Sequence, residues 1–238
     1  MVKRCLSLII LCLLLFSMDR LFAWDGEPTE ILGSCATVML DHDDRTKNIE
    51  LAVHGIQGYT LKPGKIFSFN RVVGSRSVRR GFRPAPVLFQ DKTSIQVGGG
   101  ICQVSSTLYN AALLADMEIL ERSRHSSPVS YLPLGLDATV AYGYKDLKFR
   151  NRHNFPVVID ASLSEDILTV SIFGEEKLPY EVNLTTQVTE IESPFPDQAS
   201  ESGKEVIVYR LKSSGGLMIE KEYVDRDYYH PVSGDAQE

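Results

Sequence analysis

Hydrophobic residues recur at helical spacing in two stretches of the 238-residue chain. The longer stripe places its apolar residues four, seven, eight and eleven positions after the first, and it consists of Val104, Leu108, Ala111, Ala112 and Ala115. This spacing predicts a helix with one buried face. The shorter stripe consists of Ile49, Ala52, Val53 and Ile56. Gly55 and Gly58 near its end favour a helix that stops around Gly58.

The other apolar residues form short alternating or continuous runs that are typical of strands. Runs before the central helix lie at residues 36–40, 61–69, 84–89 and 95–97. Runs after it lie at residues 118–122, 129–133, 139–144, 147–149, 157–159, 168–173, 206–211 and 218–224. The last four runs predict two hairpins. The whole pattern predicts an α+β fold, with short helices packed on an antiparallel or mixed β-sheet and β-hairpins towards the C-terminus.

Changes in composition divide the chain into four parts. Residues 1–23 read as a signal peptide, and residues 24–174 carry both helical stripes and form the predicted α+β domain. Residues 175–205 are acidic and interrupted by prolines, which predicts a linker or irregular segment. Residues 206–238 form the predicted C-terminal hairpin and a polar tail.

The N-terminal 23 residues have the charge and hydropathy pattern of a secretory signal. Lys3 and Arg4 precede an apolar run at residues 5–16, which is shorter than the roughly 20 residues that cross a bilayer. Ala23 then offers a small residue for cleavage. We therefore expect cleavage after Ala23 and export to the periplasm or cell envelope. The alternative is an uncleaved anchor, and the N-terminal segment would then be the chain's contact with a membrane.

The overall charge argues against a nucleic acid partner. The formal net charge is −6 and the isoelectric point is near 5.5, whereas a phosphate backbone selects clustered Lys and Arg side chains. The five histidines are scattered along the chain without a pair at metal-ligand spacing. We therefore expect no metal site and no cofactor.

The residues that best suggest chemistry stand at the start of the predicted central helix. Gly98, Gly99 and Gly100 directly precede Ile101 and Cys102. The unpaired N–H groups and the helix dipole at such a position stabilise a thiolate and lower the thiol pKa. We expect the glycines to leave space around the sulfur. A phosphate-binding loop is not indicated, because no Lys-Ser or Lys-Thr pair follows the glycines. The alternative is a small buried cysteine at a tight loop-to-helix junction.

Cys35 and Cys102 remain after removal of the signal segment. An even number of cysteines in an exported protein permits a disulfide. Such a bond would prevent Cys102 from acting as a nucleophile.

The chain length after the central helix allows a base near this thiol. A helix over residues 102–115 rises about 20 Å, and an extended return over residues 117–124 covers roughly 25 Å. Antiparallel packing of these two segments would bring His125 beside Cys102.

Twelve short stretches form an ordered set of motifs between residues 32 and 174. They lie at residues 48–52, 63–64, 67–70, 73–74, 81–82, 85–87, 98–111 (GGGICQVSSTLYNA), 121–122, 125–126, 128–131, 137–140 and 146–149. This set resembles the VanW family of vancomycin-resistance accessory proteins, with a weaker likeness at residues 206–229. The resemblance implies an exported cell-envelope protein associated with peptidoglycan, in a family whose biochemical activity is not settled.

Cys102, His125 and Asp137 all fall inside these motifs, whereas Cys35 stands where family members more often carry another residue. The order of Cys, helix, β element with His and then a polar residue also resembles papain-like and transglutaminase-like thiol enzymes. This resemblance makes Cys102 a nucleophile, His125 its base and Asp137 the residue that orients the imidazole. The implied enzyme is a cysteine hydrolase or transpeptidase-like enzyme acting on amides of the peptidoglycan stem peptide.

The same interpretation predicts the residues that contact the substrate. Backbone N–H groups of Cys102 or Gln103 would hold the oxyanion, and Gln96 resembles the glutamine that thiol enzymes of this type use as an oxyanion donor. The full set of predicted contacts is Gln96, Gly99, Gly100, Gln103, Ser105, Tyr109 and Tyr131.

The alternative function is a non-catalytic peptidoglycan-binding or structural envelope protein linked to glycopeptide resistance. In that case the groove would hold a cell-wall peptide or glycan against the rigid faces of Tyr109, Tyr131, Tyr142 and Tyr144. The sequence leaves both alternatives open.

Overall fold

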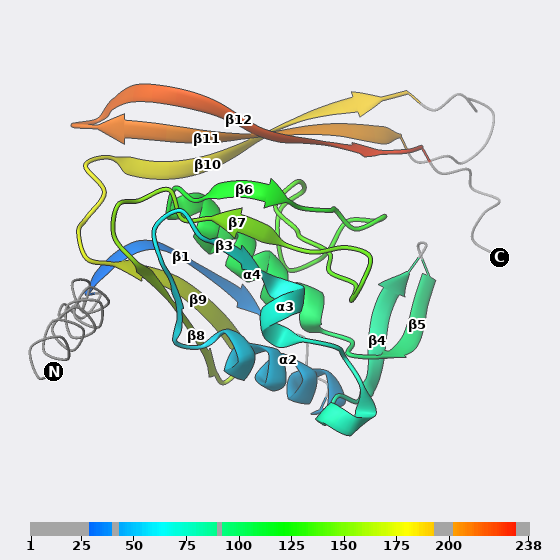
Figure 1. The fold of residues 1–238 in the computed structure, drawn as a ribbon. Helices are drawn as coiled ribbons and strands as arrows, with labels where there is room; N and C mark the ends of the chain where they lie inside the picture. The colour runs from blue at the N-terminus through cyan, green and yellow to red at the C-terminus, as the bar shows by residue number, and fades with distance from the viewer. Residues whose placement is uncertain (1–28, 40–42, 90–91, 193–201, 232–238) are drawn as a thin grey trace, which may run out of the picture.

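A four-stranded antiparallel sheet carries the two long helices on one face. The computed structural model describes residues 29–39, 43–89, 92–192 and 202–231 (Figure 1). The strand order in this sheet is β1 (Glu30–Val38), β9 (Ile167–Gly174), β8 (Val157–Ser164) and β2 (Tyr59–Leu61). Helix α4 (Ile101–Leu114) packs against β1 and β9, helix α2 (Asp43–Ile56) packs against β8, and the two helices contact each other. The predicted α+β class is confirmed.

Two smaller antiparallel sheets extend this core. Strands β3 (Ile66–Ser68), β7 (Lys148–Arg150) and β6 (Glu118–Glu121) form a three-stranded sheet in that order. Phe67 of β3 stacks on Phe149 of β7 with their ring centroids 4.8 Å apart, and both side chains are fully buried. Strands β4 (Pro84–Phe89) and β5 (Lys92–Val97) form a two-stranded ribbon. Along the chain, the short helix α3 (Phe69–Val73) and the 3-10 turn η2 (Val78–Arg80) follow β3 and precede β4.

Helix α4 is buried on all sides, so the prediction of one buried face was wrong. Its buried residues include Ser105, Ser106, Thr107 and Asn110 beside the apolar stripe. These polar side chains use their hydrogen-bonding groups on backbone atoms inside the protein, and Asn110 Nδ2, for example, donates to the carbonyl of Leu136 at 2.6 Å. A buried polar face is stable when its groups are paired in this way.

Side chains of α4 also determine the conformation of the segment that follows β6. The sequence predicted strands at residues 129–133 and 139–144, but the structure has loops there, apart from one bridge between Ala141 and Lys145. Ser105 Oγ donates to the Ala138 carbonyl at 2.6 Å, and the Ala138 N–H donates to Ser106 Oγ at 2.9 Å. The backbone here is therefore satisfied by side chains rather than by a neighbouring strand.

A third three-stranded sheet forms the C-terminal part of the described chain. It contains β10 (Glu181–Ile191), β11 (Gly203–Ser214) and β12 (Leu217–Tyr229), all antiparallel. The hairpin of β11 and β12 was predicted, as was that of β8 and β9. The prediction of an irregular segment at residues 175–205 was wrong for β10, which pairs with β11 along its whole length. Its polar residues are tolerated because one of its faces is exposed.

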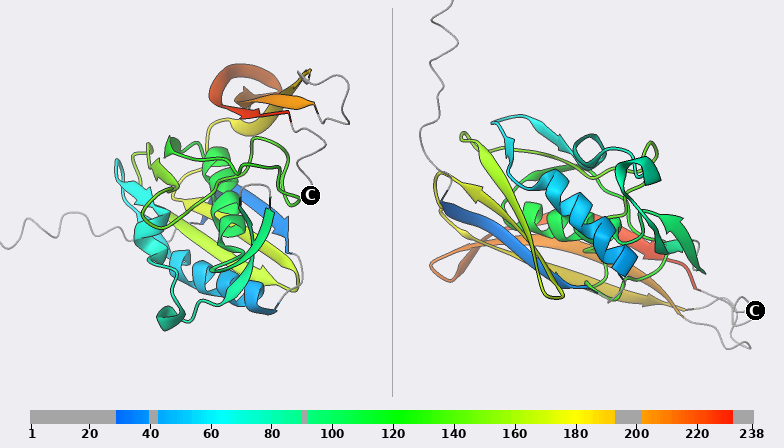
Figure 2. Two further views of the ribbon diagram at one scale, coloured as in Figure 1. Left: turned by 90° about the vertical axis from the view of Figure 1, so that its right-hand side faces the viewer. Right: turned by 90° about the horizontal axis from the view of Figure 1, so that it is seen from below.

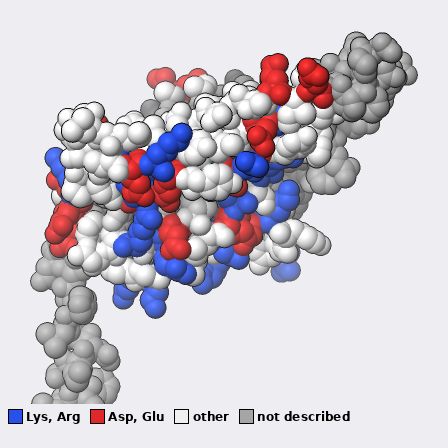
Figure 3. Space-filling model, turned by 90° about the horizontal axis from the view of Figure 1, so that it is seen from above, with Lys and Arg blue, Asp and Glu red and all other residues white. Residues whose placement is uncertain are grey.

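The C-terminal sheet forms an outer layer, and α4 lies between this sheet and α2 (Figures 1 and 2). Seen from above, the outer layer carries interspersed acidic and basic side chains (Figure 3). No helix among the described residues is long and apolar enough to cross a membrane. The predicted signal peptide, residues 1–23, lies outside the described residues.

Buried charges join the C-terminal sheet to the end of α4. Arg210 of β11 is 2% exposed. Its Nη1 donates to the carbonyls of Leu113 and Met117 at 3.1 and 3.0 Å, and it also lies 3.3 Å from Asp116 Oδ1. Its Nη2 pairs with Glu222 at 2.8 Å. One guanidinium therefore satisfies carbonyls at the end of the helix and two carboxylates at once.

Replacement of Arg210 should therefore destabilise the whole fold. We expect Arg210→Met to lower the free energy of unfolding by about 3 kcal/mol or more, because it removes a buried cation from two carboxylates and a donor from two carbonyls. Urea unfolding of the purified protein measures this change. Arg226→Met is the matched control on β12, since Arg226 is 56% exposed and lies 3.5 Å from Glu205, and it should cost less than about 1 kcal/mol. Equal losses in the two variants would contradict the prediction.

Candidate active site

The glycines before α4 allow the helix start to pack closely against its neighbours. Gly100 is the N-cap residue with φ 100°, and a Cβ atom there would lie 2.7 Å from Cγ of Arg45 on α2. A Cβ atom on Gly99 would lie 2.5 Å from the carbonyl oxygen of Ala85 on β4. Gly99 and Gly100 thus allow close approach of β4 and α2. Gly98 and Gly100 also line a pocket together with Cys102, which agrees with the expected space around the sulfur.

Cys102 occupies the second position of α4, as its place after the glycines predicted. The side chain is half-buried, and the thiol donates to the Val140 carbonyl at a sulfur–oxygen distance of 3.6 Å. The His125 side chain lines the same pocket and lies close enough to act on the pKa of the thiol. Burial raises the pKa of the thiol, but the hydrogen bond and positive charge of His125, with a further contribution from Arg76, outweigh burial and bring the pKa below its ordinary value.

His125 lies beside Cys102, so the predicted return of the chain after the helix is confirmed. Its Nδ1 lies 2.6 Å from Oδ2 of Asp137, and its backbone N–H donates to the same oxygen at 2.7 Å. Because Nδ1 is engaged by Asp137, Nε2 is the ring nitrogen left for the sulfur. Burial lowers the pKa of His125, but Asp137 and Cys102 outweigh this effect and raise it to about 9. Each side chain therefore favours the charged form of the other, because His125 lowers the pKa of the thiol and Cys102 raises the pKa of the imidazole.

Asp137 is held in its charged form by an arginine that sequence reasoning missed. Arg122 Nη2 donates to Asp137 Oδ1 at 3.1 Å, and its Nη1 pairs with Asp227 at 2.5 Å and with Asp225 at 3.2 Å. Burial raises the pKa of Asp137, but His125 and Arg122 outweigh burial and lower it. The signal was present in the motif at residues 121–122, which directly precedes the segment that carries His125.

Cys102 and His125 open into a pocket of about 360 Å³. The complete lining consists of Arg45, Pro86, Val87, Gly98, Gly100, Cys102, Gln103, His125, Pro128, Val129, Ser130 and Tyr131. Arg45 and His125 are the basic residues in this lining, and it contains no carboxylate. The pocket therefore combines a thiol, an imidazole and a guanidinium between short apolar walls.

Three of the predicted substrate contacts line this pocket, namely Gly100, Gln103 and Tyr131. The Gln103 side chain is buried, and its amide bonds to Arg45, Thr37 and the Val38 carbonyl. It is thus part of the wall rather than a free polar contact.

The other four predicted contacts do not line this pocket. Gln96 is exposed on β5, where it donates to Ser94 Oγ at 3.2 Å. Gly99 is buried against β4, and Ser105 is fully buried and bonded to the loop after residue 137. Tyr109 is fully buried under the guanidinium of Arg122, 5.6 Å from its ring centroid. Gly99, Ser105 and Tyr109 therefore contribute to packing around the site, whereas Gln96 lies on the surface.

The two backbone N–H groups that were predicted to hold an oxyanion, those of Cys102 and Gln103, differ in whether they already have an acceptor. The Gln103 N–H donates to the Gly100 carbonyl at 3.0 Å within the first turn of the helix, so it is engaged. The Cys102 N–H has no backbone acceptor among the described residues outside its own helix, which leaves it as the better donor for an oxyanion.

Cys35 and Cys102 are both free thiols, so the disulfide that their number permitted is not formed. Cys35 lies on β1, and burial raises the pKa of its thiol to about 11. The two cysteines are therefore expected to differ strongly in reactivity.

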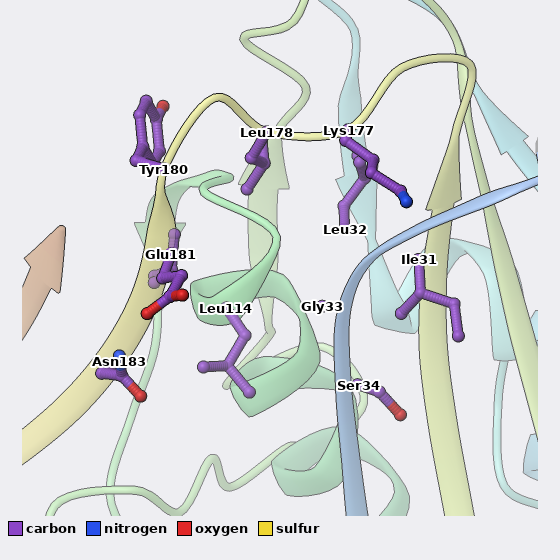
Figure 4. A pocket seen from close by; sticks show the side chains of 11 residues that line it. Ile31, Leu32, Gly33, Ser34, Leu114, Lys177, Leu178, Tyr180, Glu181 and Asn183 are labelled. Atoms are coloured by element: carbon purple, nitrogen blue, oxygen red, sulfur yellow. The ribbon is translucent and has the colours of Figure 1, made fainter. Parts of the chain in front are cut away.

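Two further pockets lie away from Cys102. One of 480 Å³ lies between β1, the end of α4 and the start of β10, where Figure 4 shows Leu32, Leu114 and Leu178 near Tyr180 and Glu181. Another, of 570 Å³, is lined by Tyr142 and Tyr144 among others. These two tyrosines therefore do not contribute to the groove at Cys102, contrary to the binding alternative.

Comparison with known proteins identifies the family. The model of VanW-like proteins matches residues 44–173, which is more than half of the chain and includes Cys102, His125 and Asp137. This chain belongs to the VanW family. The match leaves the C-terminal sheet of this VanW-family protein outside the shared region.

Two curated relatives resemble this VanW-family protein. The uncharacterized protein YoaR of Bacillus subtilis is 38% identical over 149 residues, which cover 62% of this chain and 49% of YoaR. The vancomycin B-type resistance protein VanW of Enterococcus faecalis is 28% identical over 144 residues, which cover 58% of this chain and 52% of that protein. The chain therefore matches about half the length of these relatives. No solved structure matches it significantly.

The ion pair of Cys102 and His125 predicts how the thiol reacts with pH. In a Cys35→Ala background, alkylation by iodoacetamide without denaturant should show a midpoint below the ordinary thiol pKa of 9.0. His125→Ala should raise the midpoint, because the effect of burial is then opposed only by Val140 and Arg76. Measured alkylation rates between about pH 5 and 10 test both expectations. A midpoint that His125→Ala leaves unchanged would contradict the ion pair.

Proposed function

We propose that this VanW-family protein is an exported thiol enzyme that acts on peptide amides of peptidoglycan. The observation that carries the proposal is that Cys102 and His125 line one pocket while Asp137 Oδ2 lies 2.6 Å from Nδ1 of His125. A carboxylate that orients an imidazole beside a thiol is the arrangement of thiol acyl-transfer catalysts.

The first step of this proposal is attack of the Cys102 thiolate on the carbonyl carbon of the amide. The new carbon–sulfur bond moves the carbonyl electron pair onto oxygen, and the N–H of Cys102 can donate to that oxygen. The His125 imidazolium then gives its Nε2 proton to the departing nitrogen, and the carbon–nitrogen bond breaks. The products of this step are a free amine and a thioester on Cys102.

The second step releases the acyl group. His125 is neutral after the first step, so it can take a proton from a water molecule that attacks the thioester. The carbon–sulfur bond breaks, and thiolate, imidazolium and a carboxylic acid result; the acid then loses its proton to solvent. If an amine attacks instead of water, the same geometry performs transpeptidation. Asp137 keeps the ring in the orientation that both proton transfers require.

The choice of peptidoglycan rests on the relatives. One relative is named for vancomycin resistance, and vancomycin acts on the cell wall. The resemblance of the motifs to that family supports an envelope role for this chain as well. A non-catalytic peptidoglycan-binding protein is the competing proposal, because the same pocket could hold a stem peptide without cleaving it.

Site variants separate these two proposals. We expect Cys102→Ser and His125→Ala each to lower the rate of stem-peptide cleavage or transfer by about a thousandfold, and the double variant to be little slower than either single variant. The reason is that both residues serve the same steps. Asp137→Asn should give a smaller loss, since it orients the base without taking part in bond changes. Mass spectrometry of purified peptidoglycan fragments measures the products.

Cys35→Ala is the matched control, because it removes the second thiol of the described chain away from the pocket. It should leave the rate unchanged. Circular dichroism establishes that each variant is folded. If the wild-type protein binds stem peptides without converting them, and Cys102→Ser binds them equally well, the binding function replaces the enzymatic one.

Export makes a separate prediction for the N-terminus. Because Lys3 and Arg4, the short apolar run and Ala23 fit a cleaved signal, the mature protein should begin at Trp24. N-terminal sequencing of the protein from the envelope or periplasmic fraction measures this. An intact Met1 in the membrane fraction would instead indicate an uncleaved anchor.

A further inference from the structure

Arg45 brings a buried guanidinium to the pocket from helix α2. The residue is 9% exposed, and its Nη2 donates to Oε1 of Gln103 at 2.7 Å. Its Nη1 is buried and has no hydrogen-bond partner among the described residues. Arg45 lines the pocket together with Cys102 and His125, so a guanidinium with one unpaired nitrogen belongs to the wall of the pocket.

The charge of Arg45 also lacks a counter-ion in the part of the chain that the structure describes. No ion pair is formed by this side chain there, and the pocket lining contains no carboxylate. Burial lowers the pKa of Arg45, whereas Tyr131 and Cys102 partly compensate. An arginine nevertheless stays protonated in a protein. A buried charge without a partner is costly, so this position favours an anionic ligand.

A purely structural role of Arg45 would explain the contact of Nη2 but not the unpaired Nη1. Contact with Gln103 fixes the wall of the pocket through Nη2, and the stem of Arg45 packs against Gly100. Neither contact uses Nη1. A lysine or glutamine at position 45 could also bond to the neutral amide of Gln103. The planar guanidinium of arginine, with its parallel N–H groups, is suited to a carboxylate.

The shape of the pocket indicates which carboxylate fits. At about 360 Å³ it lies at the small end of ligand pockets, which suits the end of a peptide better than an internal segment. Its apolar walls consist of Pro86, Val87, Pro128 and Val129. Together these features fit a C-terminal residue with a small apolar side chain and a free carboxylate.

We infer that Arg45 binds the free C-terminal carboxylate of a peptide, so that Cys102 acts on an amide next to the chain end. This inference rests on the proposed function and specifies its substrate class. In the first step, the amide nitrogen of the terminal residue takes a proton from His125 and leaves as a free amino acid whose carboxylate is held by Arg45. The remaining peptide stays on Cys102 as the thioester until water or an amine releases it.

Alkylation of Cys102 tests this carboxylate site without any assumption about the substrate. Iodoacetate and iodoacetamide transfer similar groups to a thiolate, but iodoacetate alone carries a carboxylate. In a Cys35→Ala background, we expect Arg45→Gln to lower the ratio of the iodoacetate rate to the iodoacetamide rate by about tenfold or more, because a charge-assisted bond is lost. Arg226→Gln makes the same charge change on exposed β12 and should leave the ratio unchanged.

A ratio that is the same in Arg45→Gln and in the parent protein would overturn the inference. If Arg45→Gln does not fold, protection of the parent protein decides the question. N-acetylalanine should slow alkylation of Cys102 by iodoacetamide, and its carboxamide should not. Equal protection by the two compounds, or protection by neither, would also overturn the inference.

A substrate pair separates failure of this inference from failure of the proposed function. The parent protein should cleave a stem peptide with a free C-terminal carboxylate at least about tenfold faster than the same peptide with a C-terminal carboxamide, and Arg45→Gln should remove this preference. Cleavage of both peptides at equal rates refutes the role of Arg45 and retains the enzyme. If neither peptide is cleaved but the alkylation ratio depends on Arg45, the carboxylate site stands and the proposed reaction does not.

Discussion

The organisation of the site depends on the contacts of one buried carboxylate, that of Asp137. It accepts the backbone N–H of His125, engages the ring Nδ1 of the same residue and pairs with Arg122. Asp137 is 2% exposed, so water cannot replace these partners. Its negative charge therefore determines both the position of the imidazole and its protonation, and through the imidazole it favours the thiolate of Cys102.

Arg122 connects this carboxylate to a part of the fold outside the family match. Its Nη1 pairs with Asp225 and Asp227 of β12, whereas the match to VanW-like proteins ends at residue 173. A second group of buried charges lies at the end of α4, where Asp116 pairs with Arg210 and Lys212 of β11. The outer sheet is therefore fixed to the core at two places by ion pairs, and one of them supports the site.

The sequence predicted the features of the site that depend on local spacing. Cys102 was placed at a helix start by the glycines and the apolar stripe, and His125 was placed beside it by the length of the returning segment. Both expectations follow from distances along one chain segment, and the structure confirms the proximity of the two side chains. Their catalytic role stays a proposal.

The features that the sequence did not predict depend on contacts between distant segments. The polar residues of α4 suggested an exposed face, but Ser105, Ser106 and Asn110 bond to the loop at residues 136–138 and are buried. Likewise, β10 has few apolar residues, and its strand conformation follows from pairing with β11. The sequence also did not predict that Arg45 lines the pocket at Cys102 and that Gln96 does not. The pocket is formed by α2, β4, α4 and the loop that carries His125, and the position of a residue in the sequence does not reveal which side chain reaches it.

In the proposed reaction, the electrostatics of the pocket would serve both activation of Cys102 and recognition of the substrate. Positive charge from His125 and Arg76 lowers the pKa of Cys102, and the same positive field attracts an anionic substrate. A carboxylate bound at Arg45 would neutralise one nearby cation and thereby disfavour the thiolate. That contact does not neutralise His125 or Arg76. His125 is hydrogen-bonded to Asp137, and Arg76 donates to Asn70. In the proposed reaction, His125 and Arg76 would therefore still lower the pKa of Cys102 after the anionic end of a substrate has bound.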